Sequence, residues 1–160
     1  MSTTKIKTKG QIDMLNNTWE EAYVYVGKEY VKLEGYFVNK DGQIKNKYGK
    51  ILKPYYIGKN RDRAVIDFKN FNGTGKRKQI KVHRIVLSTF DPDGYDFENG
   101  VNIVNHKDEN PKNNKFSNLH WCTQAYNVIY SLNLRMQRKG ENLKEIIDQV
   151  ISDSENNEAC

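Results

Sequence analysis

The chain has 160 residues, of which 37% are hydrophobic and 29% are charged, and its formal net charge is +6. This length suits one compact domain or two very small ones, and the composition excludes wholesale disorder. No apolar run approaches the roughly 18 residues of a membrane span, and residues 1–10 do not resemble a secretory signal. Cys122 and Cys160 offer neither a disulfide framework nor a paired zinc motif, so we expect a cytoplasmic protein.

The positive charge is concentrated in one part of the chain. Residues 40–84 contain fourteen Lys and Arg side chains against three Asp, whereas residues 131–160 contain four basic and six acidic side chains. A basic segment beside a neutral or acidic one favours a surface that faces a polyanion, although a solubilising face would give the same pattern.

The N-terminal half has β-like patterning. Residues 1–18 are polar and are expected to form a flexible arm. Short runs of β-forming residues follow, separated by Asp-Gly, Tyr-Gly and Asn-Gly turn dipeptides, and they lie at 23–26, 36–38 and 64–68. We expect a meander of short antiparallel strands that ends near residues 80–82.

The second half predicts a helix, a hairpin and further helices. A helix is expected over residues 83–90 and is stopped by the Asp-Pro-Asp-Gly turn at 91–94. Two short strands, 101–104 and 119–123, flank a polar loop. Thr123 is a candidate cap for a helix that begins at Gln124, and a last amphipathic helix is expected over 143–151.

A strand, loop, strand and helix in this order form a ββα hairpin. Such a hairpin brings the end of its first strand beside the start of its helix. We therefore expect Asn105, His106 and Asn127 to converge on one small volume. Each has a simpler interpretation, because an Asn-His pair at a strand end is usually a polar loop entrance and Asn127 alone is more often a solvated helix residue.

The residues of this stretch carry a family resemblance. The sequences VHRIVLSTF (82–90) and VNHKDENPKNNKFSNLHWCTQAYN (104–127) resemble the HNH nuclease domain of phage homing endonucleases. The upstream sequences YFVNKDGQI (36–44) and GKILK (49–53) resemble a small module that often precedes this domain. The resemblance implies an α+β fold: an arm (1–18), a β-rich DNA-binding module (19–80), a ββα-metal nuclease domain of the His-Me finger type (81–133) and a helical tail (134–160).

The resemblance also implies an activity with assigned residues. His106 matches the general base, Asn118 the middle residue that ties the loop together, and Asn105 and Asn127 the ligands of a divalent metal, Mg²⁺ or Mn²⁺. The implied reaction is hydrolysis of a DNA phosphodiester to 5′-phosphate and 3′-hydroxyl ends in a phage-infected or bacterial cell. Asn105 replaces the Asp that is frequent at this position, so we expect weak metal binding. Asp108 is the nearest carboxylate.

Basic side chains supply the candidate contacts to double-stranded DNA. They are Lys45, Lys47, Lys50, Lys53, Arg61, Arg63, Lys76, Arg77, Lys78, Lys81, His83 and Arg84. One site of this kind predicts a monomer that cuts one strand per visit, and the last helix offers a route to a dimer.

Three alternatives stay open at this point. The neutral Asn105 favours a catalytically decayed DNA-binding regulator. The basic segment also suits an RNA-binding protein. His83, His106, His120 and Cys122 supply zinc ligands by type, but their spacing matches no compact zinc motif.

Overall fold

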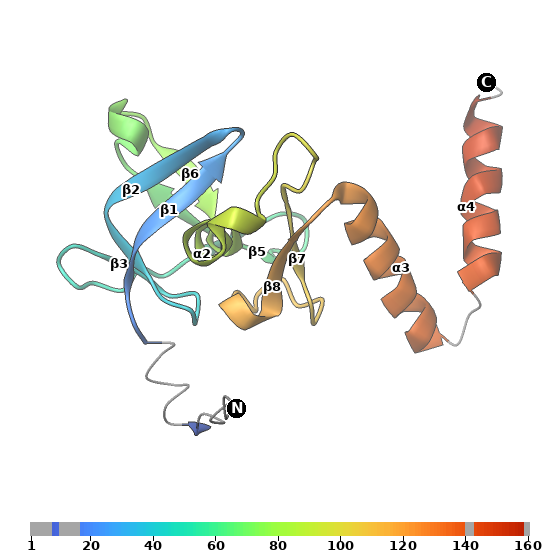
Figure 1. Cartoon of the computed structure of the whole chain (residues 1–160), viewed down its shortest axis with the longest axis horizontal. Coiled ribbons are helices and arrows are strands. Elements are labelled where there is room, and N and C mark those ends of the chain that lie inside the picture. Colours follow the sequence, from blue (N-terminus) through green and yellow to red (C-terminus); the bar gives the residue numbers. More distant parts are fainter. Residues whose placement is uncertain (1–7, 10–16, 140–142, 159–160) are drawn as a thin grey trace, which may run out of the picture. The chain divides into compact units, whose positions relative to one another are not determined.

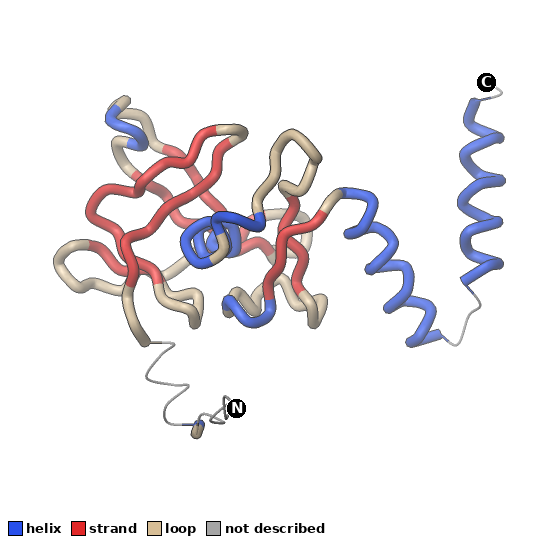
Figure 2. The backbone as a smooth tube through the Cα atoms, viewed as in Figure 1, coloured by secondary structure: helices blue, strands red, loops and turns tan. Residues whose placement is uncertain are grey.

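The computed structural model describes residues 8–9, 17–139 and 143–158. The chain divides into two compact units, of which the first ends at Cys122 and the second begins at Thr123. The arm expected over residues 1–18 lies mostly outside the described residues. Antiparallel strands and helices are both present, which confirms the α+β prediction (Figure 2). The finer division at residues 80 and 133 stays a prediction.

Two three-stranded antiparallel sheets form the N-terminal half of the first unit. One contains β1 (Glu20–Val26), β2 (Glu29–Val38) and β3 (Ile44–Asn46); the other contains β4 (Tyr55–Ile57), β5 (Arg63–Phe68) and β6 (Lys78–Lys81). The predicted strands 23–26, 36–38 and 64–68 lie within β1, β2 and β5. The expected single meander is divided because β3 pairs with β2 along one edge and makes only an isolated bridge, at Ile51, with the chain that follows.

Helix α2 (Val82–Phe90) organises the core of the first unit. Its apolar residues recur at helical spacing, so that Val82, Ile85 and Val86 are all buried. The helix packs on β1 and also contacts β2, β5, β6 and β8 (Figure 1). Full burial of a side chain of this size contributes about 1.5–3 kcal/mol. One core therefore joins both sheets to the hairpin that carries the motif.

That hairpin consists of β7 (Ile103–His106) and β8 (Leu119–Cys122). The first strand begins two residues later than expected, because Val101 instead forms an isolated bridge with Asp96. Trp121 is 7% exposed and its Nε1 donates a hydrogen bond to the Asp91 backbone oxygen at 2.9 Å. Trp121 therefore belongs to the core.

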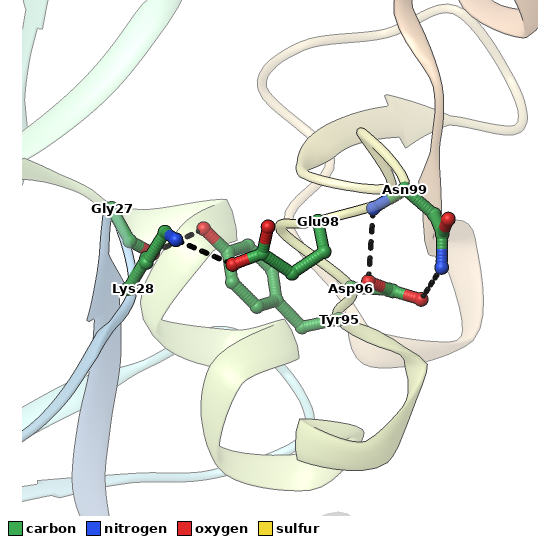
Figure 3. A network of polar contacts seen from close by, with 6 residues as sticks. All are labelled: Gly27, Lys28, Tyr95, Asp96, Glu98 and Asn99. Atoms are coloured by element: carbon green, nitrogen blue, oxygen red, sulfur yellow. Dashed lines mark hydrogen bonds and ion pairs between the residues drawn. The ribbon is translucent and has the colours of Figure 1, made fainter.

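The loop that leads from α2 to the hairpin is tied to the β1–β2 turn (Figure 3). The Tyr95 hydroxyl donates to the Gly27 backbone oxygen at 2.6 Å, and Lys28 pairs with Glu98 at 2.5 Å. Within the loop, the Asp96 carboxylate accepts hydrogen bonds from the backbone and side chain of Asn99. These contacts hold the chain on its way into β7.

The second unit contains α3 (Gln124–Lys139) and α4 (Leu143–Glu158). The Thr123 hydroxyl accepts a hydrogen bond from the Tyr126 backbone nitrogen at 3.1 Å, which confirms the predicted cap. The helix expected over 143–151 is present and continues to Glu158. Among the described helices, none is long and apolar enough to cross a membrane.

Candidate nuclease site

His106 is the last residue of β7, where the strand enters the loop of residues 107–118. In the hairpin register Asn105 lies opposite His120 and His106 lies opposite Leu119. His106 Nε2 is 3.0 Å from Asn114 Oδ1. An amide oxygen only accepts hydrogen bonds, so with Oδ1 of Asn114 facing the ring the proton is on Nε2 and the lone pair is on Nδ1. Asn114, one of two consecutive asparagines in the polar loop, is thus the hydrogen-bond partner of the candidate base.

His83, at the start of α2, lies against His106. The two rings meet edge to face with centroids 5.1 Å apart. The pKa of His83 is lowered to about 3. Burial of its ring is the main cause, followed by His106 and then by three cations, Lys81, Arg84 and Arg63. His83 is therefore neutral near pH 7. The sequence pattern did not predict that His83 would lie beside His106.

The depressed pKa of His83 predicts acid sensitivity. Between pH 6.5 and 3 the unfolded chain binds a proton at this position that the folded chain does not, so the free energy of unfolding falls as the pH falls. From pH 6.5 to 4.5 we expect His83 to contribute a loss of roughly 2 kcal/mol. Urea unfolding at several pH values measures it, and His83→Gln should show a flatter profile. Parallel profiles would contradict the assignment.

The loop of residues 107–118 is organised around Asn118, which is 8% exposed. Its Oδ1 accepts from the Asp108 backbone nitrogen at 3.0 Å, and its Nδ2 donates to Asp108 Oδ1 and to the Asn113 backbone oxygen at 2.8 and 2.9 Å. The hydrogen bond from the Asn113 side chain is the main cause of the lowered pKa of Asp108. The Asp108 carboxylate therefore acts as an acceptor within the loop, and its predicted assistance to a metal stays a prediction.

Asn105 is one of the two predicted metal ligands, and it lies in the first unit. Its side chain is 6% exposed, and its Nδ2 has no hydrogen-bond partner among the described residues. A half-turn about the last side-chain bond of Asn105 would place its amide oxygen at this unsatisfied position. A buried amide of this kind fits a hard divalent cation through one neutral oxygen ligand.

Asn127 is the predicted ligand on α3, in the second unit. Its backbone nitrogen donates to the Thr123 oxygen at 3.0 Å, and its backbone oxygen accepts from the Ser131 hydroxyl. It therefore lies in the first turn of the helix, as the sequence predicted. The convergence of Asn127 with Asn105 and His106 stays a prediction.

The candidate DNA-binding residues all lie in the first unit and differ in exposure. Eight are exposed, namely Lys47, Lys50, Lys53, Arg61, Arg63, Lys76, Arg77 and Lys81; four are half-buried, namely Lys45, Lys78, His83 and Arg84. The Arg84 guanidinium donates to the backbone oxygens of Tyr25 and Asn102 at 2.8 and 2.9 Å. Arg84 thus links β1 to the chain before β7, and its contact with DNA stays a prediction.

Comparisons with known proteins identify relatives. No family model matches the chain. It is 35% identical over 103 residues to the uncharacterized HNH endonuclease L245 of Acanthamoeba polyphaga mimivirus, a match that covers 62% of this chain and 28% of the relative. It is 39% identical over 103 residues to the DNA endonuclease I-HmuI of Bacillus phage SP01, covering 63% of this chain and 54% of that protein. The chain thus matches about half or less of these curated relatives.

A solved structure gives a broader match. It concerns DNA binding and cleavage by the HNH homing endonuclease I-HmuI, and it aligns with a TM-score of 0.53 and 32% sequence identity over 87% of this chain and 68% of that one. Sequence and fold therefore agree with the resemblance carried by residues 82–90 and 104–127. On these grounds the chain belongs to the HNH homing endonuclease family.

Proposed function

We propose that this chain is a metal-dependent endonuclease that hydrolyses a phosphodiester bond of double-stranded DNA. The observation that carries the proposal is the state of His106, an imidazole at the end of β7 whose Nε2 is held by Asn114. Among its relatives, I-HmuI is named as a DNA endonuclease. Because the chain spans only part of the curated relatives, the activity assigned to it is our inference.

In the proposed reaction His106 acts as the general base. Its Nδ1 takes a proton from a water molecule as the water oxygen attacks phosphorus. The bond from phosphorus to the 3′ oxygen breaks, and that oxygen is protonated from solvent. The products are a 5′-phosphate and a 3′-hydroxyl. Asn118 keeps the loop closed beside the base through its bonds to Asp108 and Asn113.

A divalent cation, Mg²⁺ or Mn²⁺, held by Asn105 and Asn127 would neutralise charge on the phosphate and on the departing 3′ oxygen. Both ligands are neutral amides, so the binding of such an ion is expected to depend on the DNA phosphate. The cations Lys81, Arg84 and Arg63 all act on His83, which lies against His106. Positive charge beside the base suits a phosphodiester substrate.

One observation favours a second candidate. Asn105 is neutral and adds no negative charge to a metal site, as expected of a nuclease site that has decayed. A DNA-binding regulator of this kind would have the same basic surface and the same hairpin. The two candidates share DNA binding and differ only in whether the bond is cut.

Conversion of supercoiled plasmid to nicked circle tests the proposal. With Mg²⁺ or Mn²⁺ the protein is expected to form nicked circle before any linear DNA, because a monomer with one base cuts one strand per visit. EDTA should stop the reaction, and excess Mg²⁺ should restore it. Metal-independent cutting would contradict the mechanism, whereas tight DNA binding without cutting at any metal concentration would support the decayed regulator.

A competition titration covers the RNA alternative. Duplex DNA and RNA of equal length are added to a labelled DNA complex at one salt concentration, because affinity of this kind depends on salt. The proposal predicts that duplex DNA competes better, and stronger competition by RNA would contradict it.

A further inference from the structure

The loop that holds the base contacts the turn between β2 and β3, about seventy residues earlier in the chain. The Phe116 backbone nitrogen donates to the Lys40 backbone oxygen at 2.8 Å. A Cβ atom added to Gly42 would lie 2.6 Å from the Asn114 backbone oxygen and 3.2 Å from its Cβ. The backbone of the turn is thus packed directly against the residue that accepts a hydrogen bond from His106.

The turn itself is rigidly built. Asn39 is fully buried; its Oδ1 accepts from the Gln43 backbone nitrogen and its Nδ2 donates to Gln43 Oε1, both at 2.9 Å. The Gly42 backbone nitrogen donates to the Asn39 oxygen at 3.1 Å, and Gly42 has a φ of +81°. A buried residue with both ends of its amide satisfied holds the turn in one conformation.

Asn114 connects this turn to the chemistry. It is 9% exposed, so the turn on one side and His106 on the other restrict where its amide lies. Small displacements at such a contact matter, because a shift of about 1 Å in a catalytic group costs up to about 100-fold in rate.

We propose that Asn114 is a positioning residue for His106, and that the β2–β3 turn, through Gly42, sets the place of Asn114. The hydrogen bond that Asn114 Oδ1 accepts from His106 selects the Nε2-protonated tautomer and orients the ring, while the turn supplies the rigid surface behind it. The inference rests on the proposed function of His106 as the base. Under this proposal the sheet of β1, β2 and β3 contributes to the cleavage site and also supports candidate DNA-binding side chains.

The chain contains a matched control for the turn. Gly49 has a φ of +80°, close to that of Gly42, but a Cβ at Gly49 would meet no atom within 4 Å. Gly42→Ala and Gly49→Ala therefore carry the same backbone strain. They differ in whether the new methyl group displaces Asn114.

Cleavage at saturating DNA and DNA affinity are measured separately. We expect Gly42→Ala and Asn114→Ala to lower the single-turnover rate by about 10–100-fold and to leave the DNA dissociation constant within about two-fold. Gly49→Ala should match the wild type, and Asn114→Asp, which keeps an acceptor oxygen, should recover part of the rate lost in Asn114→Ala. Equal rates for Gly42→Ala and Gly49→Ala would overturn the role of the turn.

Imidazole ¹⁵N chemical shifts provide a readout that does not depend on cleavage. His106 in the wild type should show the Nε2-protonated tautomer, and Asn114→Ala and Gly42→Ala should shift it toward a mixture, whereas Gly49→Ala should not. An unchanged tautomer in Asn114→Ala would overturn the proposal. Should the wild-type protein fail to cut DNA, the proposed function fails while these shifts still decide whether the turn positions His106.

Discussion

Replacement of His106 by alanine is expected to lower the rate of DNA cleavage by about 10²–10⁴-fold, the usual contribution of a positioned general base. The imidazole is the proton acceptor in the proposed reaction. Its Nε2 already forms a hydrogen bond with Asn114 Oδ1 at 3.0 Å, so Nδ1 is the nitrogen that takes the proton. The rate should be measured in single-turnover reactions at saturating DNA, so that a change in affinity does not enter.

Two controls separate loss of the base from loss of the fold. Because His106 is only half-buried, His106→Ala should keep the cooperative unfolding of the wild type. Added imidazole should restore part of the lost rate, since it replaces the missing proton acceptor. Cleavage by His106→Ala at the wild-type rate would remove His106 from the mechanism.

Replacement of Asn118 by alanine is the second large effect that we expect. Asn118 makes three side-chain hydrogen bonds, two with Asp108 and one with the Asn113 backbone oxygen, and is 8% exposed. Their loss leaves polar groups of the loop without partners at a cost of about 1–3 kcal/mol each. We expect a total loss of roughly 2–4 kcal/mol in the free energy of unfolding and a fall of about 100-fold in cleavage.

Asn110 provides the matched control in the same loop. It is exposed, and its Oδ1 accepts one hydrogen bond, from the Lys112 backbone nitrogen at 3.1 Å. Asn110→Ala should therefore cost about 1 kcal/mol or less. Urea unfolding and single-turnover cleavage are measured for both variants. Similar effects from the two would show that Asn118 has no special place in the loop.

The elements that carry the motif were predictable from local pattern. The spacing of Ile85, Val86 and Phe90 and the turn after Phe90 predicted a helix over residues 83–90, and α2 begins one residue earlier, at Val82. The chain around Trp121 reads as a strand because apolar residues alternate there with His120. Thr123 marks the start of α3 by its capping chemistry. These features depend on neighbours within a few residues, so the sequence contains them.

The contacts that support the base were not predictable in the same way. Asn114 is one of two consecutive asparagines in a polar loop, and nothing in its neighbours indicates which of them accepts from His106. Gly42 reads as an ordinary turn glycine, and its contact with Asn114 depends on the packing of segments about seventy residues apart. His83 also reaches His106 only because α2 packs beside the hairpin.

We propose that cleavage depends on a metal ion whose ligands include Asn105 and Asn127. A double-mutant cycle on the metal concentration required for half-maximal nicking tests it most directly. Asn105→Ala and Asn127→Ala should each raise that concentration, by about 10-fold or more if each removes one ligand. If both side chains hold one ion, the double variant will depart from the product of the two single effects by a coupling of about 0.5–3 kcal/mol. Strictly multiplicative effects, or no change in either single variant, would contradict a shared metal site.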